Sequence, residues 1–219
     1  MNIKTSASLI AICCALTIGA QAQVSVGAKA GLNVYDNYQT GTKYYTSSPG
    51  LGFHLGAYGD YDLSELLVNN LHVKVEALLS TRGANLSEFT SNGDKIDHDR
   101  QSIYIDIPTA LTYNIGDKFN LEGGVVTSLF LNEYRSITKD QQGFKIDEGD
   151  QFRTYERLQF GFLAGATYEF MLFDQTFVGG LRYNMALTPA FESIRDSRAS
   201  RAPMYMMLQA SLAYRIFDF

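Results

Sequence analysis

The chain has 219 residues, 46% of them hydrophobic, and a formal net charge of −5. An acidic chain of this kind lacks the basic surface that nucleic-acid binding requires, so we expect no nucleic-acid partner. Its two cysteines, Cys13 and Cys14, lie in an N-terminal segment with the features of a cleaved signal. The mature chain would then have no disulfide, no thiolate nucleophile and no thiolate metal site.

Residues 1–22 are predicted to be a secretory signal peptide. Lys4 supplies the positive start, residues 7–20 are apolar, and Ala20-Gln21-Ala22 fits a small-x-small cleavage site. The apolar stretch is too short to span a bilayer, which takes about 20 residues. A lipoprotein anchor on Cys13 or Cys14 is the alternative, but neither follows a Leu-Ala-Gly-like box. Residues 23–219 are then one domain, and the loss of Lys4 lowers the net charge from −5 to −6.

From residue 24 onward, apolar residues alternate with small or polar ones in segments separated by turns. Such alternation predicts β-strands with one apolar face, and no helix-period stretch of useful length competes. Eight segments fit the pattern, namely 24–34, 51–61, 71–80, 102–114, 119–131, 158–169, 177–187 and 204–216. Pro108 falls on the polar face of the fourth segment, where a bulge or local bend is expected because proline cannot donate to a ladder.

The connections between these strands alternate in length. The short ones are Gly116–Lys118 and Met171–Gln175, and Asp62–Asn70 is intermediate. The long, polar ones are Asp36–Pro49, Gly83–Gln101, Asn132–Arg157 and Thr188–Ala202. With both termini in the periplasm, every long connection lies outside the cell, as in outer-membrane barrels. The sequence therefore predicts an all-β fold, an eight-stranded antiparallel transmembrane β-barrel with long extracellular loops, in the cell outer membrane.

Alternation alone does not distinguish this barrel from a soluble one, whose apolar face points inward. The polar face is rich in glycine and has few long side chains, which favours a crowded interior over a solvated surface. Its glycines are Gly27, Gly31, Gly52, Gly56, Gly124, Gly161, Gly165 and Gly180. Aromatic residues near the strand ends would form interfacial girdles. They are Tyr35, Tyr58, Tyr61, Tyr113, Phe119, Tyr134, Tyr168, Phe170 and Phe177.

The charged residues of the polar face nearly balance. They are Lys29, Lys74, Glu76, Arg82, Asp106, Glu122, Glu169, Arg182 and Arg215. Enclosed charges are tolerated when they are paired and hydrogen-bonded, so we predict a structural ion-pair network in the lumen. Lys74, Arg82 and Arg182 are the cations expected to neutralise Glu76 and Asp106. A gated or narrow polar pore for small solutes is the alternative, since eight strands leave little space inside.

Histidine is the other chemically informative residue type. His54 and His72 fall on polar strand faces and are assigned to the lumen network. His98 lies between Asp97 and Asp99, near Asp94, which allows a metal or acid–base cluster and hence a rim hydrolase. No nucleophile elbow, phosphate-binding glycine loop or zinc motif is present. We therefore expect a non-catalytic protein without a cofactor, and keep the hydrolase as the alternative.

Four motifs resemble those of PorT-like outer-membrane β-barrel proteins of the Bacteroidetes. They are Gly27-Ala28-Lys29-Ala30-Gly31-Leu32-Asn33, Val75-Glu76-Ala77-Leu78-Leu79-Ser80-Thr81-Arg82-Gly83, Tyr104-Ile105-Asp106-Ile107-Pro108 and Gly161-Phe162-Leu163-Ala164-Gly165. The resemblance implies a structural role or one in envelope or secretion assembly. The implied partners are outer-membrane lipid, the barrel-assembly machinery and other envelope or secretion proteins.

The C-terminus departs from that family, which usually stops at Tyr-x-Phe. Here Tyr214-Arg215-Ile216 is followed by Phe217-Asp218-Phe219. Either Phe219 is the terminal aromatic, with a bulge near Asp218, or Phe217 turns inward.

Overall fold

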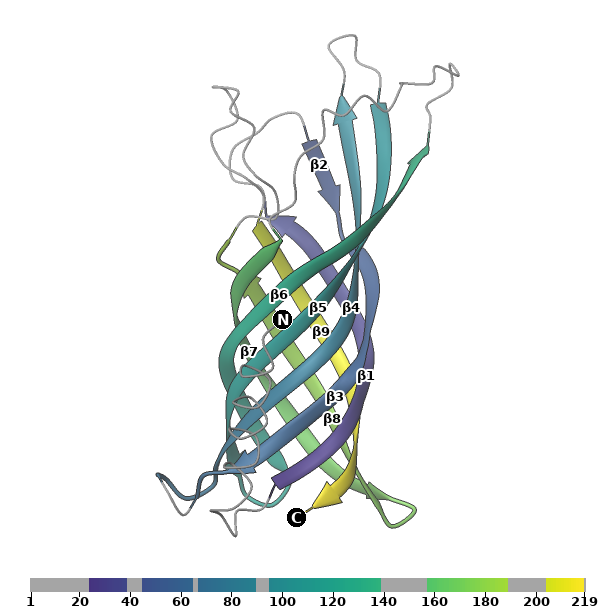
Figure 1. Cartoon of the computed structure of the whole chain (residues 1–219). Helices are drawn as coiled ribbons and strands as arrows, with labels where there is room; N and C mark the ends of the chain where they lie inside the picture. The colour runs from purple at the N-terminus through teal and green to yellow at the C-terminus, as the bar shows by residue number, and fades with distance from the viewer. Residues whose placement is uncertain are drawn as a thin grey trace, which may run out of the picture.

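A computed structural model describes residues 24–38, 45–64, 67–89, 95–138, 157–188 and 204–218. The predicted signal peptide lies outside them. The described chain is an antiparallel sheet closed into a barrel (Figure 1). Its strands are β1 (Val24–Tyr38), β2 (Tyr45–Ser48), β3 (Gly50–Asp62), β4 (Leu71–Phe89), β5 (Lys95–Ile115), β6 (Phe119–Thr138), β7 (Leu158–Leu172), β8 (Gln175–Ala186) and β9 (Met204–Asp218).

The barrel ring contains eight strands. Each pairs with the next along the chain from β3 to β9, and β1 joins β3 to β9, so the ring has no free edge. The predicted eight-stranded barrel is thus confirmed. Closure satisfies the backbone hydrogen bonds that lipid could not. No helix in the described part of the chain is long and apolar enough to cross a membrane.

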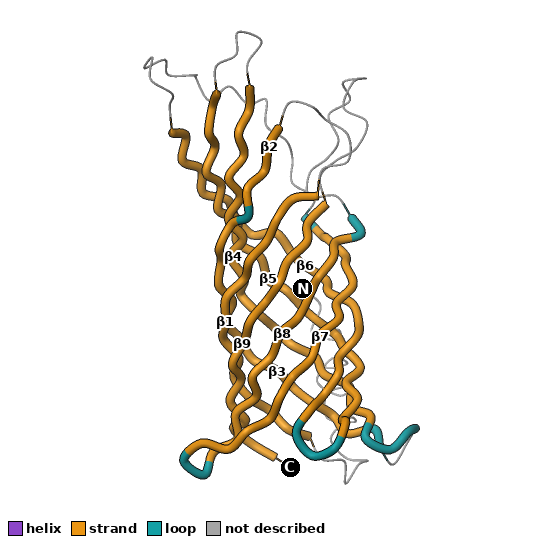
Figure 2. The backbone as a smooth tube through the Cα atoms, turned by 180° about the vertical axis from the view of Figure 1, so that it is seen from behind, coloured by secondary structure: helices purple, strands orange, loops and turns teal. Residues whose placement is uncertain are grey.

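Three strands continue beyond the barrel and, with β2, form a sheet that projects from one end (Figures 1 and 2). We call this sheet the extension. β4 and β5 pair out to Phe89 and Lys95, β6 pairs with β5 out to Thr138, and β2 pairs with β4. The predicted loops Gly83–Gln101, Asn132–Arg157 and Asp36–Pro49 are therefore partly wrong. A sheet outside the membrane has no need of an apolar face toward lipid, so the sequences of these strands lack the apolar alternation that identified the others.

The apolar face of the barrel points outward. Leu32, Leu51 and Leu181 are 65%, 74% and 60% exposed, whereas Asn33 and His54 on the other face are buried. The soluble-barrel alternative, which needs the reverse arrangement, is therefore wrong.

Aromatic side chains are exposed at the end of the barrel with the short turns, among them Tyr113, Phe119 and Tyr168. Two residues assigned to the girdles are not there, because Tyr35 and Tyr58 are only 3% and 6% exposed and lie in the lumen. In the alternation of inward- and outward-facing residues along its strand, each of the two tyrosines falls at an inward position. The Tyr134 side chain lies outside the described part of the structure.

The irregularities of the sheet differ from those predicted. At Pro108 the ladder with β4 is interrupted between Val75–Thr109 and Leu78–Asp106, so a local irregularity lies where one was expected. The register does not change across it, so of the two alternatives, bulge or local bend, the bulge is wrong. A register shift lies instead at Ile103/Tyr104, against β6.

The other register shift is near the C-terminus. Val26 pairs with Phe217 and Gly27 with Arg215, which leaves Ile216 as the extra residue, two positions before Asp218. Phe217 is 59% exposed, so its predicted inward turn is wrong. Phe219 lies outside the described residues.

Candidate functional site

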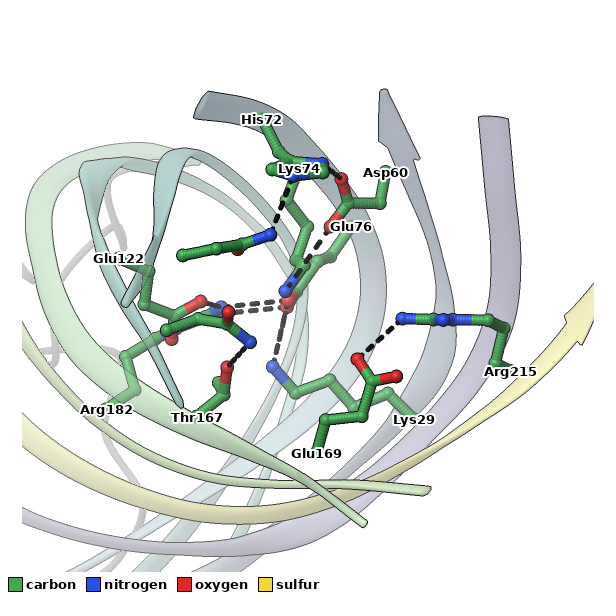
Figure 3. Close-up of polar contacts among 12 residues, drawn as sticks. Lys29, Asp60, His72, Lys74, Glu76, Glu122, Thr167, Glu169, Arg182 and Arg215 are labelled. Atoms are coloured by element: carbon green, nitrogen blue, oxygen red, sulfur yellow. Dashed lines mark hydrogen bonds and ion pairs between the residues drawn. The ribbon is translucent and has the colours of Figure 1, made fainter. Parts of the chain in front are cut away.

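The middle of the lumen is occupied by two cations and two carboxylates from four strands (Figure 3). We call Lys29, Glu76, Glu122 and Arg182 the central belt. The Arg182 guanidinium donates to both oxygens of Glu76 at 2.8 Å each, and to both oxygens of Glu122 at 2.8 and 2.9 Å. Lys29 Nζ donates to Glu76 at 2.9 and 3.1 Å. Each residue is at most 7% exposed, so the four charges neutralise one another away from water.

A glycine makes the central belt possible. Gly165 of β7 is the register partner of both Glu122 on β6 and Arg182 on β8. A Cβ atom at Gly165 would lie 2.7 Å from Glu122 Oε1 and 2.7 Å from the Leu181 carbonyl oxygen. The missing side chain therefore leaves the space in which Arg182 reaches Glu122 across β7.

Toward the extension, the lumen is filled by a second group, the upper cluster of Arg82, Asp106, Ser128, Gln159 and Tyr104. Arg82 forms an ion pair with Asp106 and donates to Ser128 Oγ at 2.8 Å and Gln159 Oε1 at 3.3 Å. Its guanidinium carbon lies 4.0 Å from the centre of the Tyr104 ring, within cation–π distance. Arg82 is thus neutralised by one carboxylate and lies over the Tyr104 ring, and the centre of the Tyr205 ring is 5.8 Å from the same guanidinium carbon.

Uncharged side chains also cross the lumen. Asn33 donates to Ser80 Oγ at 3.0 Å, and its Oδ1 accepts from Gln209 at 3.1 Å and lies 2.7 Å from His54 Nδ1. Asn184 donates to Gln209 Oε1 at 2.7 Å. All five are buried. They link β1, β3, β4, β8 and β9 by hydrogen bonds at a further level of the barrel.

In outer-membrane barrels the short turns lie at the periplasmic end, and we name the ends of this barrel accordingly. The periplasmic end holds a cavity of about 450 Å³ whose lining includes the central-belt residues Lys29 and Glu76. We call it the vestibule. Arg215 lies 2.8 Å from Glu169, and Asp60 lies 3.6 Å from Lys74 and 3.3 Å from His72 (Figure 3).

The predicted network residues thus fall into three groups. Lys29, Glu76, Glu122 and Arg182 form the central belt, Arg82 and Asp106 belong to the upper cluster, and Lys74, Glu169 and Arg215 line the vestibule. Of the three cations expected to neutralise Glu76 and Asp106, Arg182 meets Glu76 and Arg82 meets Asp106. The third, Lys74, is paired with Asp60 instead. Asp60 was missed by sequence reasoning, although it shares the inward parity of His54 and Tyr58.

His98, the centre of the hydrolase hypothesis, does not belong to the lumen groups. The backbone of His98 is in β5 within the extension, paired with Leu86 and Ile137, and its side chain lies outside the described part. His54 and His72 both lie in the lumen. No group of three or more histidine, cysteine or acidic residues fit to hold a metal occurs among the described side chains.

The sequence was compared with models of known protein families. The family model described as outer membrane protein beta-barrel domain matches residues 20–192. The chain belongs to this family. It is accordingly an outer-membrane β-barrel protein of the cell envelope.

Solved barrels of the same kind are distant in sequence. Ail, the attachment invasion locus protein of Yersinia pestis, solved with a heparin analogue, is 14% identical over 90% of this chain and 100% of its own, with a TM-score of 0.43. Neisserial surface protein A is 15% identical, over 88% of this chain and 99% of its own, with a TM-score of 0.43. OprG of Pseudomonas aeruginosa is 9% identical, over 89% of this chain and 95% of its own, with a TM-score of 0.45. The comparison with curated proteins found no match.

Proposed function

We propose that this protein is a closed, non-catalytic barrel that acts through its surfaces in envelope or secretion assembly. The observation that supports this proposal is the filling of the lumen. The central belt and the upper cluster are both buried and charge-balanced. Within each group, ion pairs connect strands across the barrel. A wide water-filled channel instead needs a lumen that side chains leave open.

The extension supplies the surface through which such a protein would meet a partner. It combines β2 with the outer parts of β4, β5 and β6, beyond the level where β7 stops pairing with β6 at Leu129. The resemblance to PorT-like proteins of the Bacteroidetes supports a partner within the envelope or a secretion apparatus. In whole cells, a photo-crosslinking residue at Ser136 in the extension should give one defined adduct. The same residue at lipid-facing Leu181 should give none, and the absence of an adduct from Ser136 would contradict the assembly role.

A narrow porin is the second candidate, and the vestibule favours it, since a cavity of about 450 Å³ already enters the barrel from one end. Swelling of proteoliposomes in small sugars and amino acids separates the two. The closed barrel predicts swelling at the rate of protein-free vesicles, whereas solute-dependent swelling would make the porin the better account.

A further inference from the structure

The vestibule carries a surplus of negative charge that the rest of the lumen does not. Central belt and upper cluster are each neutral. The charged residues that line the vestibule below the central belt are Asp60, Asp62, Asp117, Glu169, Asp218, Lys74, Arg215 and His72. Five carboxylates thus face two permanent cations, a formal charge of −3 when His72 is neutral and −2 when His72, 3.3 Å from Asp60, is protonated. A concave acidic site with low-dielectric walls concentrates cations.

Asp60 and Asp218 lie on either side of the same residue of β1. Ser25 of β1 pairs with Asp60 on one side and with Asp218 on the other. Neighbouring strands lie about 4.8 Å apart, so the two acidic residues are separated by roughly 10 Å at the backbone. Asp60 lies 3.6 Å from Lys74, and Asp218 lies 3.7 Å from Arg215, so a bound ammonium group would share each carboxylate with a cation of the protein. Two ammonium groups joined by a short chain of methylenes can bridge such a separation.

Two further features of the vestibule suit such a molecule. Thr112 lines the cavity and is 2% exposed, and its buried hydroxyl has no hydrogen-bond partner among the described residues. Tyr58, Val178 and Ala213 pack into an apolar patch in the same wall. An ammonium donates three hydrogen bonds and accepts none, and methylenes favour an apolar wall. A bare metal ion fits poorly, because the described side chains offer no metal-binding group of three ligands.

We propose that the vestibule binds aliphatic polyamines from the periplasm. Their ammonium groups lie against the carboxylates on either side of β1, and the methylene chain lies on the Tyr58 patch. The volume of the vestibule falls within the range of small-molecule sites. Binding at this end does not depend on whether the lumen above the central belt is closed.

The test is calorimetric titration of spermidine into the refolded mature barrel in detergent. The double variant Asp60→Asn/Asp218→Asn should bind at least about fivefold more weakly, since two partly exposed charge contacts are lost. The matched control is Asp174→Asn. Asp174 lies in the turn between β7 and β8, outside the vestibule, and its positive φ of 59° is tolerated by asparagine. The control should bind like the unmodified protein.

Thr112→Val is the second variant, because it removes the unpartnered hydroxyl while keeping the side-chain shape. It should weaken spermidine binding about threefold, the loss of one modest hydrogen bond. Heat-modifiable migration on gels verifies that each variant is folded. Three results would overturn the proposal: no spermidine binding by the unmodified barrel, unchanged affinity in either test variant, or an equal loss in the Asp174 control. Binding of a lysine-rich peptide without binding of spermidine would also overturn it.

Discussion

Arg182 of β8 forms a two-point ion pair with Glu122 of β6, although these strands are not neighbours in the sheet. The strand between them contributes Gly165 at the crossing point. The long charged side chains fit into this lumen because glycines on the inner face leave room for them.

Gly165→Ala should destabilise the barrel by about 1–3 kcal/mol, the usual cost of overpacking. The added methyl would lie 2.7 Å from Glu122 and from a backbone oxygen, and the latter has little freedom to move. Gly123→Ala is the matched control, because a Cβ there meets nothing within 4 Å. Urea unfolding of the barrel in lipid or detergent measures both, and equal stability of the two variants would contradict this packing.

Glu76→Gln should cost about 3–5 kcal/mol of unfolding free energy, since it leaves Lys29 and Arg182 sharing one carboxylate in a buried site. Glu169→Gln is the comparison. Its ion pair with Arg215 is nearly one-third exposed, so its loss should cost only about 0–1 kcal/mol. Equal costs at the two positions would mean that water reaches the central belt.

Leu181→Arg tests which face of the barrel meets lipid. Leu181 is exposed and adjoins Arg182 in sequence, so it lies at the depth of the central belt. Arginine at the middle of a bilayer should cost about 2–4 kcal/mol, but about 0–1 kcal/mol near the interface. Met171→Arg, at the periplasmic end of β7, is the interfacial control. A neutral Leu181→Arg would argue against a membrane-facing surface.

His98→Ala should leave any hydrolytic activity of the cell surface unchanged, because we propose that the protein is not an enzyme. Protease and lipase assays on whole cells that carry each form measure this directly. Selective loss of one activity in the variant, with normal amounts of folded barrel, would restore the rim-hydrolase alternative.

How far the sequence could predict this structure depends on where lipid acts on the chain. Inside the membrane, residues such as Leu32 and Leu181 must be apolar, and their alternation with polar residues identified the eight strands. Beyond the membrane that requirement ends, and residues such as Ser87 and Ser136 do not reveal the extension. The alternation along each strand identified most lumen residues, and two of the expected pairs are present, Arg182 with Glu76 and Arg82 with Asp106. The other contacts were not predicted. Lys74 meets Asp60, and Arg182 meets Glu122 across β7, because the stagger of the closed barrel decides which side chains share a level.

The central claim is that buried ion pairs close the lumen, and single-channel recording in planar bilayers tests it most directly. The refolded, unmodified barrel should add no sustained current to the bilayer, because Arg182, Glu76, Glu122 and Lys29 occupy the middle of the lumen. Successful insertion can be shown on the same preparation by protease protection and heat-modifiable migration. A large, stable, ohmic conductance from the inserted protein would show that water fills the lumen, and would contradict the closed barrel.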